Sequence, residues 1–120
     1  ISAPGPGRAG AYMAELPLNA WLKAMLFAVK PKGRITLIHR AGMLGDILAY
    51  LMSRSGQIEI LPVRSAPGDA AKRVLVTARK GLRRGETILH EGLTTHQARG
   101  GAAYTAVAER VLRGEALDWA

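Results

Sequence analysis

The stretch VKPKGRITLIHR, residues 29–40, constrains the fold of this chain more than any other. Six apolar residues at helical spacing lead into it and predict a helix from about Leu18 to Val29: Leu18, Trp21, Leu22, Met25, Leu26 and Val29. Pro17 suits the first turn of that helix, and Pro31 with Gly33 ends it. The run RITLIH that follows is rich in β-branched residues and almost wholly apolar, which indicates a strand covered on both faces, as in a parallel sheet.

The pattern after Arg40 predicts a second helix and then a hairpin. Apolar residues again recur at helical spacing from about Met43 to Arg54, and Gly56 is expected to end that helix. Two strand-like runs follow, QIEILPV at residues 57–63 and KRVLVTAR at residues 72–79. Because no helical pattern separates them, we expect an antiparallel hairpin.

The last third of the chain predicts two shorter elements. ETILHE, residues 86–91, is expected to add a short edge strand. AYTAVAERVLRG, residues 103–114, predicts a final helix with Thr105 as its N-cap and Gly114 as its C-cap. The order is therefore helix, strand, helix, antiparallel hairpin, short strand and final helix, in one α/β domain over residues 11–120, after a flexible Gly- and Pro-rich lead-in at residues 1–10.

Composition narrows the class of function. The 120 residues contain no cysteine, which excludes disulfides, thiolate metal sites and a cysteine nucleophile. Seventeen Lys and Arg against nine Asp and Glu give a formal charge of +8, the footprint expected for a protein whose partner is rich in phosphate. A basic protein that binds no nucleic acid remains the alternative. No apolar run reaches the roughly 20 residues that a membrane-spanning helix needs.

Several stretches together resemble one family. They are the turn Lys30-Pro31-Lys32-Gly33 between a helix and a strand, RITLIHR at residues 34–40, AAKRVLV at 70–76, ARKG at 78–81, ILHEG at 88–92, YT at 104–105 and LRGEAL at 112–117. As a set, over about residues 9–118, they resemble the C-terminal half of class I S-adenosylmethionine-dependent methyltransferases. Within that class the likeness is to the bacterial tRNA(Val) adenine N6-methyltransferase family.

The resemblance implies a fold, a reaction and a missing half. It implies the C-terminal half of a Rossmann-like class I methyltransferase sheet, in a cytoplasmic enzyme that methylates tRNA at an adenine N6 with S-adenosylmethionine. That family binds its cofactor through a Gly-rich loop after its first strand and holds the target amine with an Asn-Pro-Pro motif. The sequence has neither: its only Asn is Asn19, and PGPGRAG, residues 4–10, follows no strand. We therefore expect this chain to be a fragment that is inactive alone, without catalytic or cofactor-binding residues.

The resemblance also places candidate contacts with RNA. His39 and Arg40 end the first predicted strand, and ligands in open α/β sheets bind outside the carboxyl ends of parallel strands. The densest basic tract adds Lys72, Arg73, Arg79, Lys80, Arg83 and Arg84, with Arg64 across the hairpin. Such side chains contact phosphates without reading the sequence. The alternative is that His39 is a hydrogen-bonded strand-end residue and the cations form a solvated face.

Other residue patterns predict less. His90, Glu91 and His96 invite a metal-site interpretation, but their spacing is not the helical pair of a zinc protease, and we expect no metal. Trp21 and Phe27 fall within a helical pattern and are expected in the core, which leaves no stacking platform for bases.

Two functions from different classes stay open. The first is the methyltransferase fragment, and the second is a non-catalytic basic module that binds nucleic acid or a protein partner. If the strand near residues 34–39 has lost a neighbouring strand, its uncovered edge is expected to form a homodimer or larger assembly.

Overall fold

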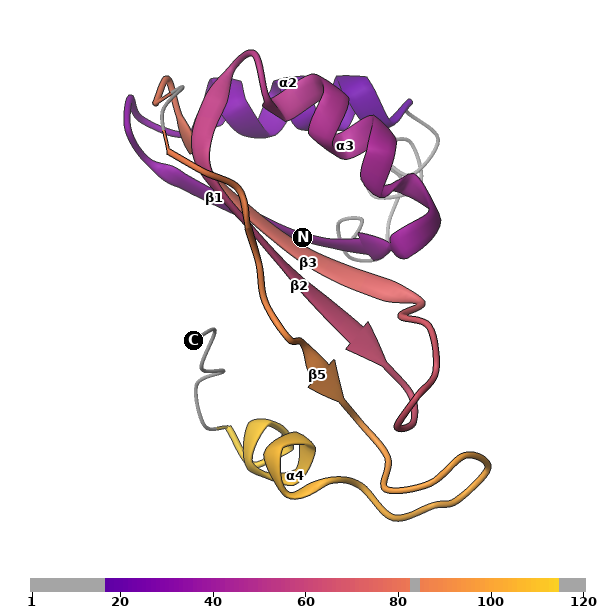
Figure 1. The fold of residues 1–120 in the computed structure, drawn as a ribbon. Helices are drawn as coiled ribbons and strands as arrows, with labels where there is room; N and C mark the ends of the chain where they lie inside the picture. Colours follow the sequence, from indigo (N-terminus) through magenta and orange to yellow (C-terminus); the bar gives the residue numbers. More distant parts are fainter. Residues whose placement is uncertain (1–16, 83–84, 115–120) are drawn as a thin grey trace, which may run out of the picture.

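A five-stranded mixed sheet with two helices packed on one face forms the molecule (Figure 1). The structure is a computed structural model that describes residues 17–82 and 85–114, so the predicted lead-in at residues 1–10 lies outside the described residues. The three long strands are β1 (Arg34–Arg40), β2 (Ser55–Arg64) and β3 (Arg73–Lys80). Two short strands, β4 (Ile88–Leu89) and β5 (Leu93–Thr94), follow.

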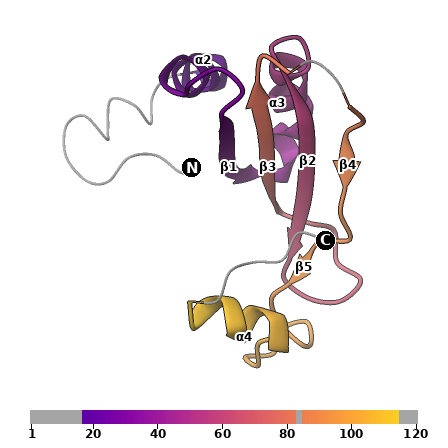
Figure 2. The same cartoon turned by 90° about the vertical axis from the view of Figure 1, so that its left-hand side faces the viewer.

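The position of β3 determines the topology. The strand order is β1-β3-β2-β4, and β5 also pairs with β2 (Figure 2). β3 is antiparallel to both β1 and β2, so these two strands run parallel to each other on either side of it. β4 and β5 pair parallel with β2 along its outer edge. The predicted hairpin and the short edge strand are therefore confirmed, whereas β5 was not predicted.

Two helices cover one face of this sheet. They are α2 (Leu18–Ala28) and α3 (Leu44–Leu51), and the short 3-10 helix η1 (Ala41–Met43) leads into the second (Figure 1). Their buried side chains meet those of alternate residues of β1, β2 and β3 in one core: Leu22, Leu26, Ile35, Leu37, Ile47, Leu51, Ile58, Ile60, Val74, Val76 and Ala78. A fourth helix, α4 (Ala106–Leu112), lies beside β5 and begins at Thr105, whose hydroxyl accepts a hydrogen bond from the Ala108 amide at 3.2 Å. This confirms the predicted N-cap. The C-cap is Arg113, and Gly114 follows it with φ 97°.

The turn between α2 and β1 is tied to the far end of β3. The Lys32 amide donates to the Lys80 carbonyl at 3.0 Å, and the Lys80 amide donates to the Gly33 carbonyl at 2.8 Å. The Lys80 ammonium donates to the Val29 carbonyl, at the C-terminus of α2, at 3.0 Å. These bonds explain how one four-residue turn fixes both the helix and the strand that it joins.

Three expectations about single elements were wrong. β1 is not covered on both faces, because Ile35 and Leu37 are buried while Thr36 and Ile38 are exposed on the other side. Gly56 does not end a helix: α3 ends at Leu51, and Gly56 lies within β2. Phe27 is 86% exposed rather than in the core, because α2 turns it away from the sheet, and Trp21 is only partly buried.

The second face of the sheet carries a polar network instead of a helix. The buried hydroxyl of Thr77 accepts a hydrogen bond from Arg34 Nη1 at 3.1 Å. Arg34 Nη1 also lies 3.8 Å from Glu59 Oε2, and Glu59 Oε1 lies 2.8 Å from His90 Nε2. The network links side chains from β1, β3 and β2 with the residue after β4, so it holds the register of the sheet on the side that lacks helices.

Replacing Gly33 with alanine tests the turn. A Cβ there would lie 2.5 Å from Val29 Cγ2 and 2.8 Å from the Lys30 carbonyl oxygen, which forces the turn to open. We expect Gly33→Ala to lower the free energy of unfolding by about 1–3 kcal/mol, measured by urea denaturation. Gly45→Ala in α3 is the control, since nothing lies within 4 Å of its Cβ position, and it should leave stability unchanged or raise it by up to about 1 kcal/mol. Equal behaviour of the two variants would contradict this account of the turn.

Candidate functional site

The carboxyl ends of β1 and β2 form a basic rim. Arg40 ends β1 and faces Arg73, the first residue of β3, across the ladder. Val63 of β2 also pairs with Arg73, so Arg64 and Lys72 continue the same edge. The structure thus brings together five of the residues predicted to face RNA, which we call the basic rim: His39, Arg40, Arg64, Lys72 and Arg73. Rims of this type hold the ligands of open α/β sheets.

His39 has an unsatisfied ring nitrogen. Its Nδ1 is buried and has no hydrogen-bond partner among the residues that the structure describes. A buried polar atom without a partner is uncommon and costs free energy. The two interpretations of His39, a contact with RNA and a structural strand-end residue, both stay predictions.

Two of the other predicted basic residues, Arg79 and Lys80, lie at the opposite end of β3. Arg79 pairs across the ladder with Arg34, at the start of β1, and its Nε donates to the Lys32 carbonyl at 2.9 Å. Lys80 caps α2 as described above. The run from Lys72 to Lys80 is thus not one surface, because an eight-residue strand separates its two ends by roughly 25 Å. Arg83 and Arg84 lie outside the described residues.

A hollow of about 350 Å³ opens beside the basic rim. Its walls come from the loop between β2 and β3 and from the loop between β5 and α4, and they include Asp69, Lys72, His96 and Arg99. An ion pair between Arg99 and Asp69 joins the two loops. The sequence analysis missed Asp69 and Arg99, because they are 30 residues apart and belong to no motif.

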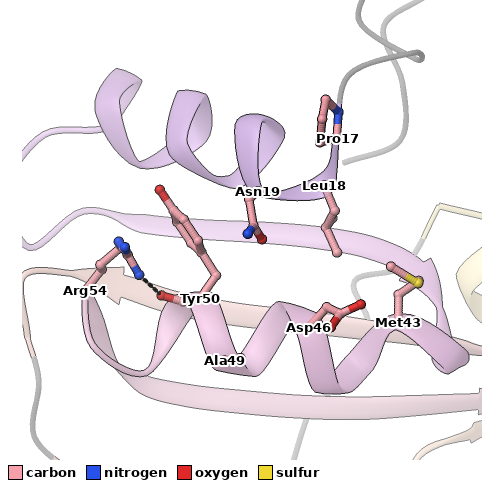
Figure 3. A pocket seen from close by; sticks show the side chains of 8 residues that line it. All are labelled: Pro17, Leu18, Asn19, Met43, Asp46, Ala49, Tyr50 and Arg54. Atoms are coloured by element: carbon pink, nitrogen blue, oxygen red, sulfur yellow. Dashed lines mark hydrogen bonds between the residues drawn. The ribbon is translucent and has the colours of Figure 1, made fainter.

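A second hollow of about 550 Å³ lies between the helices. Figure 3 shows Leu18 and Asn19 pointing from α2 toward α3, with Tyr50 pointing back toward α2 and Asp46 beside it. The guanidinium of Arg54 lies 3.9 Å from the Tyr50 ring centroid and donates to the Tyr50 carbonyl at 2.9 Å. The groove combines apolar walls with amide, carboxylate and hydroxyl groups, but no two of these form the contact that a nucleophile and its base require.

The histidines considered for a metal have separate partners. His90 lies against Glu59, whereas His96 Nδ1 lies 2.8 Å from the Thr95 hydroxyl and its ring lies 4.7 Å from that of Tyr104. Within residues 17–82 and 85–114, no three His, Asp or Glu side chains gather in a geometry that could hold a metal ion. The same residues contain no helix long and apolar enough to cross a membrane.

One comparison with known proteins carries an argument. No protein-family model matches the sequence, and no curated protein matches it. Among solved structures, the chain is similar to a predicted O-methyltransferase from Agrobacterium tumefaciens, with a TM-score of 0.74 and 30% sequence identity. The match covers 83% of this chain and 47% of the other, so this chain spans about half the length of its neighbour. The fold is therefore methyltransferase-like, as the resemblance implied.

The connections after β1 and β2 do not fit S-adenosylmethionine. The connection after β1 is the short 3-10 helix at Ala41–Met43, with one glycine. The loop after β2 offers Gly68 and Asp69, but the Asp69 carboxylate is paired with Arg99, so it is not free to bind the hydroxyls of a ribose. We derive no step through the cofactor from these residues.

Lys80 and Lys72 make a matched pair for testing which lysine is structural. Lys80→Met removes the hydrogen bond to the Val29 carbonyl at the C-terminus of α2, and should lower the free energy of unfolding by about 1–2 kcal/mol. Lys72 is exposed, so Lys72→Met should change stability by less than about 0.5 kcal/mol. Thermal and urea unfolding measure both. An unchanged stability of the Lys80 variant would contradict a structural role for this lysine.

Proposed function

We propose that this chain is the C-terminal portion of an S-adenosylmethionine-dependent methyltransferase that acts on RNA in the cytoplasm. The observation that carries the proposal is the sheet: two parallel strands flank an antiparallel β3, in a fold similar over 83% of the chain to the structure of a predicted O-methyltransferase. The chain contributes the far side of the sheet and one part of the substrate rim. The cofactor is held by residues other than those described, and the chain alone does not transfer a methyl group.

RNA is the proposed substrate because of where the charge lies. The formal charge is +8, and the basic rim stands at the carboxyl ends of the parallel strands, where substrates of such sheets bind. Arginine and lysine side chains there position phosphates and give an affinity that falls steeply with salt. The sequence stretches that resemble the tRNA adenine N6 family support adenine N6 as the acceptor.

The alternative function is a non-catalytic basic domain that binds nucleic acid. It shares the rim and the charge but has no part in methyl transfer. The upstream coding sequence separates the two: a Gly-rich loop after a strand and an Asn-Pro-Pro motif before residue 1 would support the methyltransferase, and a start codon close to residue 1 would support the alternative.

Titrations on the chain test the RNA proposal. We expect it to bind an unmodified tRNA with an affinity that falls about tenfold or more between 50 and 200 mM salt. Arg40→Gln should weaken binding and reduce the slope of log affinity against log salt by about 1, because one phosphate contact is lost. Lys23→Gln, which removes an exposed charge from α2, is the control and should leave the slope unchanged.

Two results would contradict the proposal. The first is RNA binding that is absent or independent of salt. The second is micromolar binding of S-adenosylmethionine by this chain in calorimetry, since that would place the cofactor site within the residues that do not fit it.

We propose further that two copies associate through β1. This strand forms the edge of the described sheet: β3 lies on one side of it and no described strand on the other. Ile38 is 39% exposed on the face without helices. Exposed strand edges next to apolar side chains are templates for pairing between chains.

Ile38→Lys tests the dimer. A charge beside the edge opposes strand pairing, so we expect the variant to be monomeric in light scattering at a concentration where the unmodified chain is dimeric. Phe27→Lys, which removes an exposed apolar side chain from the other face, is the control and should stay dimeric. A monodisperse monomer for the unmodified chain, or loss of the dimer only in the Phe27 variant, would overturn the proposal.

A further inference from the structure

We infer that the hollow beside the basic rim is a binding site for a phosphate group, held by Lys72 and Arg99. We call it the phosphate pocket, and Ser65, Asp69, His96 and Gly100 also line it. The inference deepens the proposed function. It rests on that function only in naming phosphate, rather than another anion, as the ligand. It assigns a role to the loop between β5 and α4, which neither the rim nor the resemblance explains.

The charge of the pocket is positive. Lys72 and Arg99 carry two positive charges against the single carboxylate of Asp69, and Arg64 and Arg73 stand next to it on the rim. Arg99 offers five N–H donors, and one of its nitrogens, Nη2, contacts Asp69. Its remaining donors and the three of Lys72 are open to a ligand, since no other described group is paired with either side chain.

The backbone around the pocket is fixed in advance. The Lys72 amide donates to the Val63 carbonyl at 3.2 Å, and its own carbonyl accepts from the Ala41 amide at 2.8 Å. Lys72 is thus anchored between the ends of β1 and β2 before any ligand arrives. Such anchoring reduces the entropy lost on binding.

The opposite wall is held as firmly. The His96 amide donates to the Ser65 carbonyl at 2.8 Å, and the Thr95 amide donates to the Arg64 carbonyl at 2.9 Å. His96 also forms an antiparallel bridge with Tyr104, whose ring packs against the imidazole. The loop therefore joins the strand end at a defined position, and Arg99 contacts Asp69 across the pocket from that loop.

Phosphate is the anion that this set of donors suits. A guanidinium presents a planar fork and an ammonium a compact charge, and the two together contact several oxygens of one phosphate. The hollow of about 350 Å³ is at the lower end of the range of ligand pockets, so it suits one phosphate with part of a sugar rather than a whole dinucleotide.

The experiment is an NMR titration of the labelled chain with inorganic phosphate, followed through the backbone amides of His96, Gly100 and Gly101. We expect their signals to shift, and Lys72→Gln to raise the dissociation constant about tenfold. Lys23→Gln, which removes the same charge at a distant site on α2, should change it less than about twofold. Because Arg99→Lys keeps the charge but loses the fork, it should weaken binding less than Arg99→Gln, and the melting temperature checks that each variant is folded.

Two further titrations, one with an RNA oligonucleotide and one with a mononucleotide, identify the source of the phosphate. An RNA oligonucleotide without terminal phosphates that shifts the same signals supports a phosphodiester of the RNA backbone. A mononucleotide that shifts them when the oligonucleotide does not supports a terminal phosphate. No shift with any of the three ligands, or equal weakening by Lys72→Gln and Lys23→Gln, overturns the inference. RNA binding that depends on Arg40 but not on Lys72 would overturn it as well, and would leave the proposed function intact.

Discussion

β3 pairs with all seven residues of β1 on one side and with most of β2 on the other, antiparallel to both. This pairing makes β1 and β2 parallel and brings their carboxyl ends to one edge of the sheet. The core depends on it, because Val74, Val76 and Ala78 lie between the side chains of β1 and β2 under the two helices. The basic rim depends on it too, because Arg73 stands between Arg40 and Val63 in the ladder.

The two faces of the sheet are held by different kinds of interaction. On one face, α2 and α3 bury leucine and isoleucine side chains, and dispersion and the hydrophobic effect hold the layers together. On the other, Arg34, Thr77, Glu59 and His90 form a network of hydrogen bonds and ion pairs that is partly open to solvent. A layer placed over this second face would have to offer polar partners to the network and apolar ones to Ile38.

Local sequence patterns predicted which residues form helices and strands better than they predicted what packs against those elements. The helix at Leu18–Ala28, the antiparallel pair and the Thr105 cap follow from spacing and from residue types that act over a few positions. The prediction that β1 is covered on both faces failed because an apolar run such as RITLIH shows only that its side chains tolerate burial. It does not report whether a second layer is present.

The candidate site depended more on long-range pairing. His39 and Arg40 were found from their place at the end of a predicted strand, and Lys72 and Arg73 from a dense basic tract. The ladder brings the two pairs together. Arg79 and Lys80 are close in sequence to the second pair, yet the length of β3 carries them to the opposite end. Asp69 and Arg99 meet only because β5 returns along β2, a path that no local pattern encodes.

The central place of β3 also orders the events of folding. Of the three long strands it is the last in sequence, and β1 and β2 are joined only through it. Among the described residues, α2 and α3 precede β3 in the chain, so the strand that joins β1 to β2 comes after the helices that pack on the sheet. Closure of the described core therefore depends on pairing between strands that are distant in sequence, a topology that is expected to fold slowly.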